Sequence, residues 1–173
     1  MYNFSLLVSY SWGAYTEAKE EITTVLMTLG DEKPIVKCTV AEGIMGVKTR
    51  LDPRELIRGL RALFEKNPFL LQHTLKWVPV DLWIYSDMDS MKEAVLALRN
   101  KIQAGERWRM TVEKRRYTRY HKIEIIRELA DLINEKVDLE NPDKILRIDM
   151  VGKYAGVSVL APQEIFSVAK PLP

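Results

Sequence analysis

The sequence predicts an α+β fold made of two small domains, at residues 1–80 and 81–173. Its 173 residues are enough for one large or two small domains. Short β-rich runs alternate with longer segments whose apolar residues recur at helical spacing. The apolar fraction of 47% is ordinary for a protein that buries a core. No apolar run approaches the ~20 residues of a membrane helix, so we expect no membrane association.

The first half predicts the element order β-α-β-β-α-β, which is the ferredoxin-like split βαβ unit. Thr16 is the expected cap of the first helix, and Gly30 its left-handed terminator. Asp52 followed by Pro53 predicts the start of the second helix. Pro79 indicates that the extended segment continues as an irregular or edge strand. The expected elements lie at residues 3–11, 16–30, 34–40, 42–51, 54–67 and 70–84.

The second half predicts a helix, a strand, a helix and a hairpin. Ser86 or Asp87 caps the first of these helices. In the strand, alternation places Trp108 on the buried side. Gly152-Lys153 is the expected hairpin turn. The elements lie at residues 86–102, 107–117, 121–137 and 144–160, with a poorly ordered tail at 169–173. The expected apolar stripe of the second helix is Ile126, Leu129, Ala130, Ile133 and Val137.

Cysteine and histidine are scarce, which limits the chemistry available. Cys38 is the single cysteine, so no internal disulfide forms, and it is expected to be a small buried residue in a strand. The start of the chain has no basic secretory signal, and a cytoplasmic protein is expected. His73 and His121 lie far apart on different elements. No metal-ligand spacing, glycine-rich phosphate loop or nucleophile elbow is present. We therefore expect no catalytic residue, no metal, no cofactor and no enzymatic activity.

Positive charge is concentrated in one stretch of a chain whose net charge is only +2. Between Arg99 and Lys122 there are nine basic and two acidic residues. Such a patch is typical of a protein that binds a polyanion, although a solvated charged face is the alternative. The helix at 121–137 carries balanced charge and no base-reading pattern, which favours RNA over duplex DNA.

The basic stretch passes from the end of a strand into the first turn of a helix. Free backbone N–H groups there favour an anion, and nearby Arg and Lys side chains would hold phosphates. The two tyrosines either stack on unpaired bases or pack under the loop. The candidate RNA-binding residues are Arg107, Arg109, Lys114, Arg115, Arg116, Tyr117, Arg119, Tyr120 and Lys122.

The span from about Trp83 to Ala169 resembles a THUMP domain. The matching segments are "MKEAVLALRNKI", "RWRMTVEKRRY", "IEIIRELADLI" and the connector "VDLENPD" leading into the last strands. The front segments "NFSLLVSYSWGAYTEAKEEITTVLMTLGD" and "GIMGVKTRLDPRELIRGL" are similar to the opening of stand-alone THUMP proteins that assist tRNA cytidine N4-acetylation.

The resemblance implies a non-catalytic adaptor that binds tRNA near the acceptor end. Its partner would be a separate tRNA-modifying enzyme, an RNA cytidine acetyltransferase. Other THUMP proteins carry a methyltransferase, deaminase or thiouridine-synthase domain, and the sequence contains no such segment. Two alternatives remain open. One is an RNA-binding subunit or fragment of a tRNA thiouridine synthase or methyltransferase, and the other is a scaffold whose basic patch meets an acidic protein.

Overall fold

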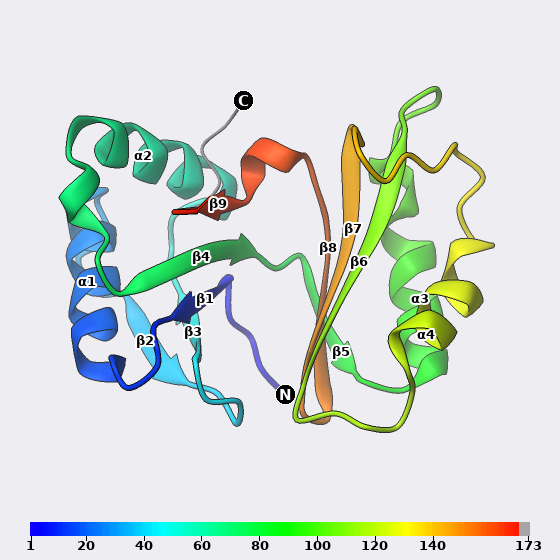
Figure 1. Ribbon diagram of the computed structural model, residues 1–173, viewed down its shortest axis with the longest axis horizontal. Coiled ribbons are helices and arrows are strands. Elements are labelled where there is room, and N and C mark those ends of the chain that lie inside the picture. Colours follow the sequence, from blue (N-terminus) through cyan, green and yellow to red (C-terminus); the bar gives the residue numbers. More distant parts are fainter. Residues whose placement is uncertain (170–173) are drawn as a thin grey trace. The chain divides into compact units, whose positions relative to one another are not determined.

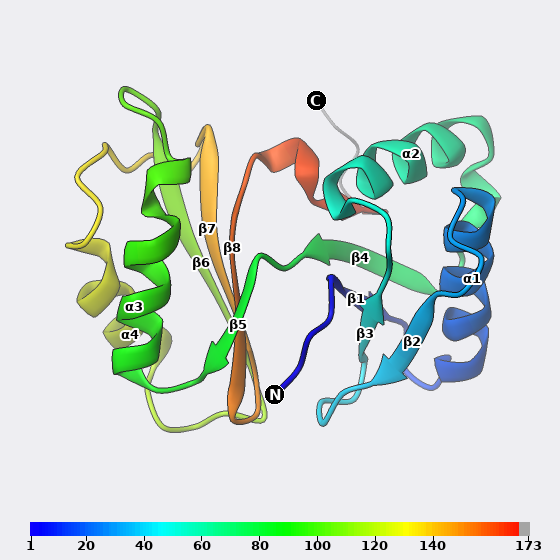
Figure 2. The ribbon, with the colours of Figure 1, turned by 180° about the vertical axis from the view of Figure 1, so that it is seen from behind.

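The computed structural model describes residues 1–169, which form two compact units, each built around its own sheet (Figures 1 and 2). The five-stranded unit contains Asn3–Pro79 and residues 163–169, and the four-stranded unit contains Met1–Tyr2 and Val80–Pro162. The predicted α+β class is confirmed. Among the described residues, no helix is long and apolar enough to cross a membrane.

The five-stranded unit has the expected element order. It consists of β1 (Leu6–Tyr10), α1 (Tyr15–Thr28), β2 (Ile35–Cys38), β3 (Ile44–Lys48), α2 (Pro53–Lys66) and β4 (Thr74–Pro79), joined by β9 (Phe166–Ser167). The strand order is β2-β3-β1-β4-β9, and all pairs are antiparallel. Apolar side chains of α1 and α2 share one core with those of β1, β3 and β4, so both helices cover the same face of the sheet.

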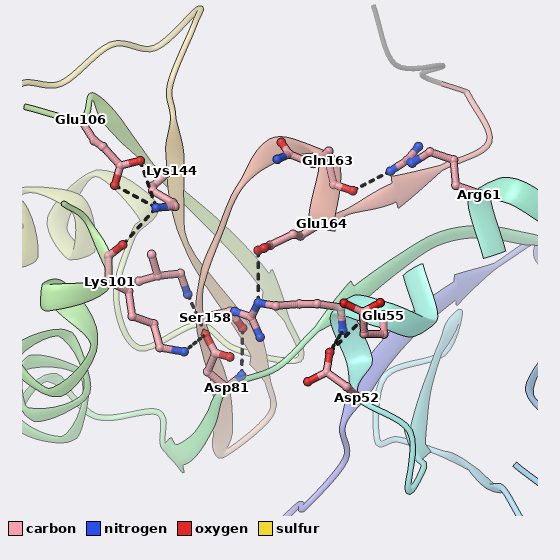
Figure 3. Close-up of polar contacts among 12 residues, drawn as sticks. Asp52, Glu55, Arg61, Asp81, Lys101, Glu106, Lys144, Ser158, Gln163 and Glu164 are labelled. Atoms are coloured by element: carbon pink, nitrogen blue, oxygen red, sulfur yellow. Dashed lines mark hydrogen bonds and ion pairs between the residues drawn. The ribbon is translucent and has the colours of Figure 1, made fainter. Parts of the chain in front are cut away.

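The chain crosses from one unit to the other after Pro79 and returns after Pro162. In β9, Phe166 is buried and pairs with Trp77, and its ring centroid lies 5.3 Å from that of Phe64. Arg61 donates from Nη2 to the Gln163 carbonyl at 2.8 Å (Figure 3). Residues 163–169 therefore belong to the five-stranded unit, whereas the sequence predicted one continuous domain at 81–173. Residues 170–173, most of the expected poorly ordered tail, lie outside the described part of the chain. A two-residue strand has no periodicity that could predict its pairing.

Helix ends in the five-stranded unit follow the predicted caps in part. The Asp52 side chain accepts from the backbone N–H groups of Arg54 and Glu55, both at 3.0 Å (Figure 3), as predicted. Gly30 has φ +109° after α1, also as predicted. The cap at Thr16 is wrong, because α1 begins at Tyr15 and Ala14 precedes it without a side-chain cap.

The prediction that Cys38 is buried is wrong. Cys38 ends β2, which is an edge strand of its sheet, and its side chain is exposed. Of the four residues in β2, only Val36 is buried. The apolar appearance of the segment does not distinguish an edge strand with one buried contact from an interior strand.

The four-stranded unit contains the basic stretch. It consists of β5 (Leu82–Tyr85), α3 (Met88–Leu98), β6 (Trp108–Arg115), α4 (Lys122–Ala130), β7 (Lys144–Val151) and β8 (Tyr154–Leu160), in the strand order β5-β8-β7-β6. β6 and β7 are parallel and are joined through α4, whereas the other pairs are antiparallel. Both helices pack on one face of the sheet (Figure 1). β5 is an edge strand, as Pro79 predicted, and Gly152 forms the hairpin turn with φ +64°.

Helix α4 is shorter than the apolar pattern predicted. It ends at Ala130, and Val137, which we expected in the buried stripe, is 50% exposed. Ile125 is fully buried in place of Ile126, which is only partly buried. The backbone beyond the helix pairs with β6: Trp108 N–H donates to the Lys136 carbonyl at 3.0 Å. The open edge of β6 thus provides hydrogen bonds that compete with continuation of the helix.

Candidate nucleic-acid interface

The last residues of β5, β6 and β7 lie side by side at one end of the four-stranded sheet, and both helices begin at this end (Figure 1). Gly152 N–H donates to the Arg115 carbonyl at 2.8 Å, and Ser86 N–H donates to the Lys153 carbonyl at 2.9 Å. These bonds tie the ends of β6 and β5 to the turn between β7 and β8. We call residues 85–87, 114–122 and 152–154 the strand-end surface.

The two helix starts on this surface differ in capping. In α3, Asp87 accepts from Ser90 N–H at 2.8 Å and from the Ser90 hydroxyl at 2.9 Å. The Ser90 N–H, the Ser90 hydroxyl and the nearby charge of Arg119 together hold the pKa of Asp87 below its usual value, against the effect of burial. In α4, the cap residue His121 makes no side-chain cap bond. The N–H groups of the first turn of α4 are therefore the ones open to an anion.

Five of the predicted basic residues lie on the strand-end surface: Lys114, Arg115, Arg116, Arg119 and Lys122. The first two belong to β6, which ends at Arg115, two residues before the end of the predicted strand at 107–117. Because side chains alternate along a strand and Val112 is buried in the helix-covered core, Lys114 lies toward that face and Arg115 toward the opposite face.

Two of these five cations are paired with carboxylates. Arg115 Nη1 lies 3.0 Å from Asp149 Oδ1, and Lys122 Nζ lies 3.8 Å from Glu113 Oε2. The Arg119 guanidinium lies 5.2 Å from the centre of the Tyr120 ring, a cation–π contact. These two ion pairs reduce the charge that a polyanion can contact, but the net charge of the strand-end surface stays positive.

Arg116 has an unusual backbone. Its φ of +56° is the one positive value at a non-glycine position among the described residues. An L-residue in the left-handed region carries a cost of about 1 kcal/mol or more, and such residues cluster at functional sites. The turn directs the chain from the end of β6 into the loop before α4, and the exposed side chain of Arg116 stands at this bend.

The two tyrosines of the basic loop are partly buried. Both Tyr117 and Tyr120 pack against the apolar core of the four-stranded unit. The Tyr117 hydroxyl is buried without a hydrogen-bond partner in the described part of the chain, and burial raises the pKa of Tyr117. Of the two roles left open for Tyr117, packing under the loop is the one that the structure shows.

The structure does not bring Arg107 and Arg109 to this surface. They lie at the start of β6, whereas the strand-end surface begins at its far end, roughly 20 Å away at ~3.3 Å per residue. Arg107 Nη1 lies 3.0 Å from Asp138 Oδ2, and Arg109 Nη1 donates to the Leu139 carbonyl at 3.1 Å. Lys144, also at this end, binds the Glu106 carboxylate at 2.8 Å (Figure 3). Arg107 and Arg109 are therefore separate from the other candidate RNA-binding residues, and their contact with RNA stays a prediction.

Two residues of the surface were missed by the sequence reasoning. Lys153 was interpreted only as a turn residue, yet its Nζ lies 5.3 Å from the centre of the Tyr154 ring, beside the end of β6. Tyr85 ends β5 and is 54% exposed. A lysine in a hairpin turn is a weak signal, because only strand pairing decides which other segment it will lie against.

Residues 85–160 match the family model described as "THUMP domain". The chain carries a THUMP domain. The match includes the entire strand-end surface, and it confirms the resemblance inferred for this part of the sequence. THUMP domains are RNA-binding domains of tRNA modification, so the match indicates an RNA-binding role for the four-stranded unit.

Three solved structures share the fold over nearly the whole chain. PH1313 from Pyrococcus horikoshii Ot3 has a TM-score of 0.65 at 16% identity, with 90% of this chain and 54% of that chain covered. TrmN from Thermus thermophilus has a TM-score of 0.63 at 17% identity, with coverages of 91% and 46%. A 4-thiouridine synthetase in an RNA complex with bound ATP has a TM-score of 0.59 at 17% identity, with coverages of 95% and 42%.

The chain spans about half the length of these solved structures. At such identities the likeness shows the fold alone. The search of curated proteins found no match.

Proposed function

We propose that this chain is a non-catalytic cytoplasmic protein that binds tRNA near the acceptor end and presents it to a separate tRNA cytidine N4-acetyltransferase. The observation that carries the proposal is the strand-end surface within a THUMP domain, where cations from two chain segments, 114–122 and 152–154, meet an uncapped helix start. The similarity of the front segments to acetylation adaptors supports the choice of the acetyltransferase.

The surface suits the sugar-phosphate backbone of RNA. The first-turn N–H groups of α4 can bind one phosphate, and Arg116 and Arg119 can hold others through bidentate hydrogen bonds. Arg115 can bind a further phosphate, and its guanidinium is already oriented because Asp149 binds one side of it. Contacts of this type position an RNA without reading its sequence.

A second candidate function is the RNA-binding part of a tRNA thiouridine synthase or methyltransferase. The observation that favours it is the likeness to the 4-thiouridine synthetase of the RNA complex, of whose length this chain covers 42%. In that case the strand-end surface would have the same role, but the chemistry would be methylation or sulfur transfer.

The experiment that separates these candidates is deletion of the gene, followed by mass spectrometry of nucleosides from total tRNA. Loss of N4-acetylcytidine supports the adaptor, whereas loss of 4-thiouridine or of a methylated nucleoside supports the second candidate. Wild-type protein should restore the modification, and a variant with Arg116→Ala and Arg119→Ala should not. An unchanged nucleoside profile would contradict both.

A further inference from the structure

One row of side chains crosses the strand-end surface on the sheet face opposite the helices. Backbone pairing aligns Arg115 of β6 with Val151, Val151 with Tyr154, and Tyr154 with Tyr85. Leu82 and Ile84 pack against the helix-covered core, so by alternation Tyr85 lies on the other face. Arg115 and Tyr85 thus stand on the same face of the sheet, three strand spacings apart, which is roughly 14 Å.

The tyrosine end of this row is held in place. The Tyr85 and Tyr154 ring centroids lie 5.6 Å apart with 41° between the planes. Tyr2 packs edge-on against Tyr154 and Trp83, with a centroid distance of 5.3 Å to each. The Ser86 hydroxyl donates to the Gly152 carbonyl at 2.9 Å, which fixes the end of β5 against the turn that carries Lys153. A ring held in this way loses little conformational freedom when a ligand stacks on it.

Tyr85 is the exposed member of this aromatic group, at 54%. Lys153 beside it is also exposed, and its ammonium group lies 5.3 Å from the Tyr154 ring, with no carboxylate partner in the described structure. An aromatic face with an adjacent cation matches the two parts of a single-stranded nucleotide, the base and its phosphate. Bases inside a duplex cannot reach such a ring, because both of their faces are stacked.

We propose that Tyr85 is a stacking platform for one unpaired nucleobase of the bound RNA, and that Lys153 contacts the adjoining phosphate. This inference rests on the proposed function, because it adds a base-binding position to the phosphate-binding surface. It also replaces Tyr117, whose ring is packed under the loop, as the residue that stacks on RNA. The cations near Arg115 would then hold the backbone, and Tyr85 would select RNA with an unpaired nucleotide.

The test compares two hairpin RNAs that differ only in a short single-stranded extension, with binding to the full chain measured by fluorescence anisotropy. Tyr85→Ala should weaken binding of the extended hairpin by about 5-fold or more, the loss of one stacked base, and leave the blunt hairpin unchanged. Tyr85→Phe keeps the ring and should bind both hairpins as the wild type does. Lys153→Met should weaken the extended hairpin more than the blunt one.

The controls separate this inference from the proposed function. Tyr85→Leu keeps apolar bulk without an aromatic face, so it should weaken binding of the extended hairpin and leave the blunt hairpin unchanged. This variant keeps the test decisive if the alanine variant unfolds. If Tyr85→Ala and Tyr85→Leu bind both hairpins normally, or weaken both equally, the stacking role is overturned while RNA binding stands. Loss of an enzyme partner with normal RNA binding would instead assign Tyr85 to a protein interface. If the wild type binds neither these hairpins nor tRNA, the proposed function fails as well.

Discussion

Arg115 and Asp149 form an ion pair beside the end of β6, with 3.0 Å between Nη1 and Oδ1. The same carboxylate accepts from Arg147 Nε at 2.8 Å and Nη2 at 3.1 Å. One carboxylate therefore serves two guanidinium groups, and the cluster keeps a surplus of positive charge. Asp149 orients Arg115 and leaves part of its guanidinium open to a further anion.

Replacing Asp149 should destabilise the protein. Asp149→Asn leaves the guanidinium of Arg147, which is only 6% exposed, without its counter-charge, and we expect a loss of about 3 kcal/mol in the free energy of unfolding. Urea unfolding measures this loss. The matched control is Glu55→Gln, which breaks the exposed pair with Arg58 and should cost less than about 1 kcal/mol. Equal losses in the two variants would contradict a structural role for Asp149.

Neutralising the open cations should weaken RNA binding and its salt dependence. Arg116→Ala with Arg119→Ala removes two proposed phosphate contacts and breaks no close ion pair in the described structure, although Asp87 loses the nearby charge of Arg119. We expect the slope of log K against log salt to become shallower by about one to two units. Filter binding of tRNA at several salt concentrations measures the slope. Arg107→Ala with Arg109→Ala, at the opposite end of β6, should leave it unchanged, and an equal change in both double variants would refute the assignment.

Removing the buried hydroxyl of Tyr117 should stabilise the protein, in contrast to the replacement of Asp149. Because it has no hydrogen-bond partner among the described residues, its removal in Tyr117→Phe should raise the free energy of unfolding by about 1 kcal/mol. Thermal or urea unfolding checks this, and RNA affinity should not change. Tyr85→Phe is the control, since that residue is 54% exposed and its hydroxyl should contribute little. A less stable Tyr117→Phe variant would show that the hydroxyl is satisfied after all.

Asp87 should make the free energy of unfolding depend on pH in the acidic range. Its pKa is lowered by the Ser90 N–H, the Ser90 hydroxyl and the charge of Arg119. A carboxyl group whose pKa is lower in the folded state adds stability above its unfolded pKa of about 4, and loses it as the pH falls toward the folded value. Asp87→Asn should therefore flatten the decline in unfolding free energy below about pH 4. Urea titrations across this range test it, and an unchanged decline in the variant would argue against the cap as the source.

Local signals in the sequence predicted much of the framework. Asp52 before Pro53, Gly30 and Gly152 each fix the backbone within a few residues, so the caps and turns that they predict are where the structure has them. The failures occur where distant segments decide the outcome. Helix α4 ends early because the backbone near Val137 pairs with β6, and Cys38 is exposed because β2 lies at a sheet edge.

For the candidate site, the sequence predicted the stretch of cations but not their arrangement in space. The sequence concentrates cations between Arg107 and Lys122, but it cannot tell that Arg107 and Arg109 lie at one end of β6 and the other cations at or beyond its far end. Nor can it show that Asp149 pairs with Arg115, because the two residues lie 34 positions apart in the chain. Lys153 and Tyr85 join the surface only through backbone pairing between β5, β8 and β7.

By itself, the sequence determined the α+β class, most helix and strand positions, the THUMP resemblance and the basic stretch before α4. These depend on side-chain periodicity, on caps and on charge within short windows, which act over a few residues. Tertiary structure alone decided which cations are paired, which aromatic ring is exposed and which strand ends lie side by side at one end of the sheet. Those features depend on the register between strands, and register is set by hydrogen bonds and packing between residues that are remote in the chain.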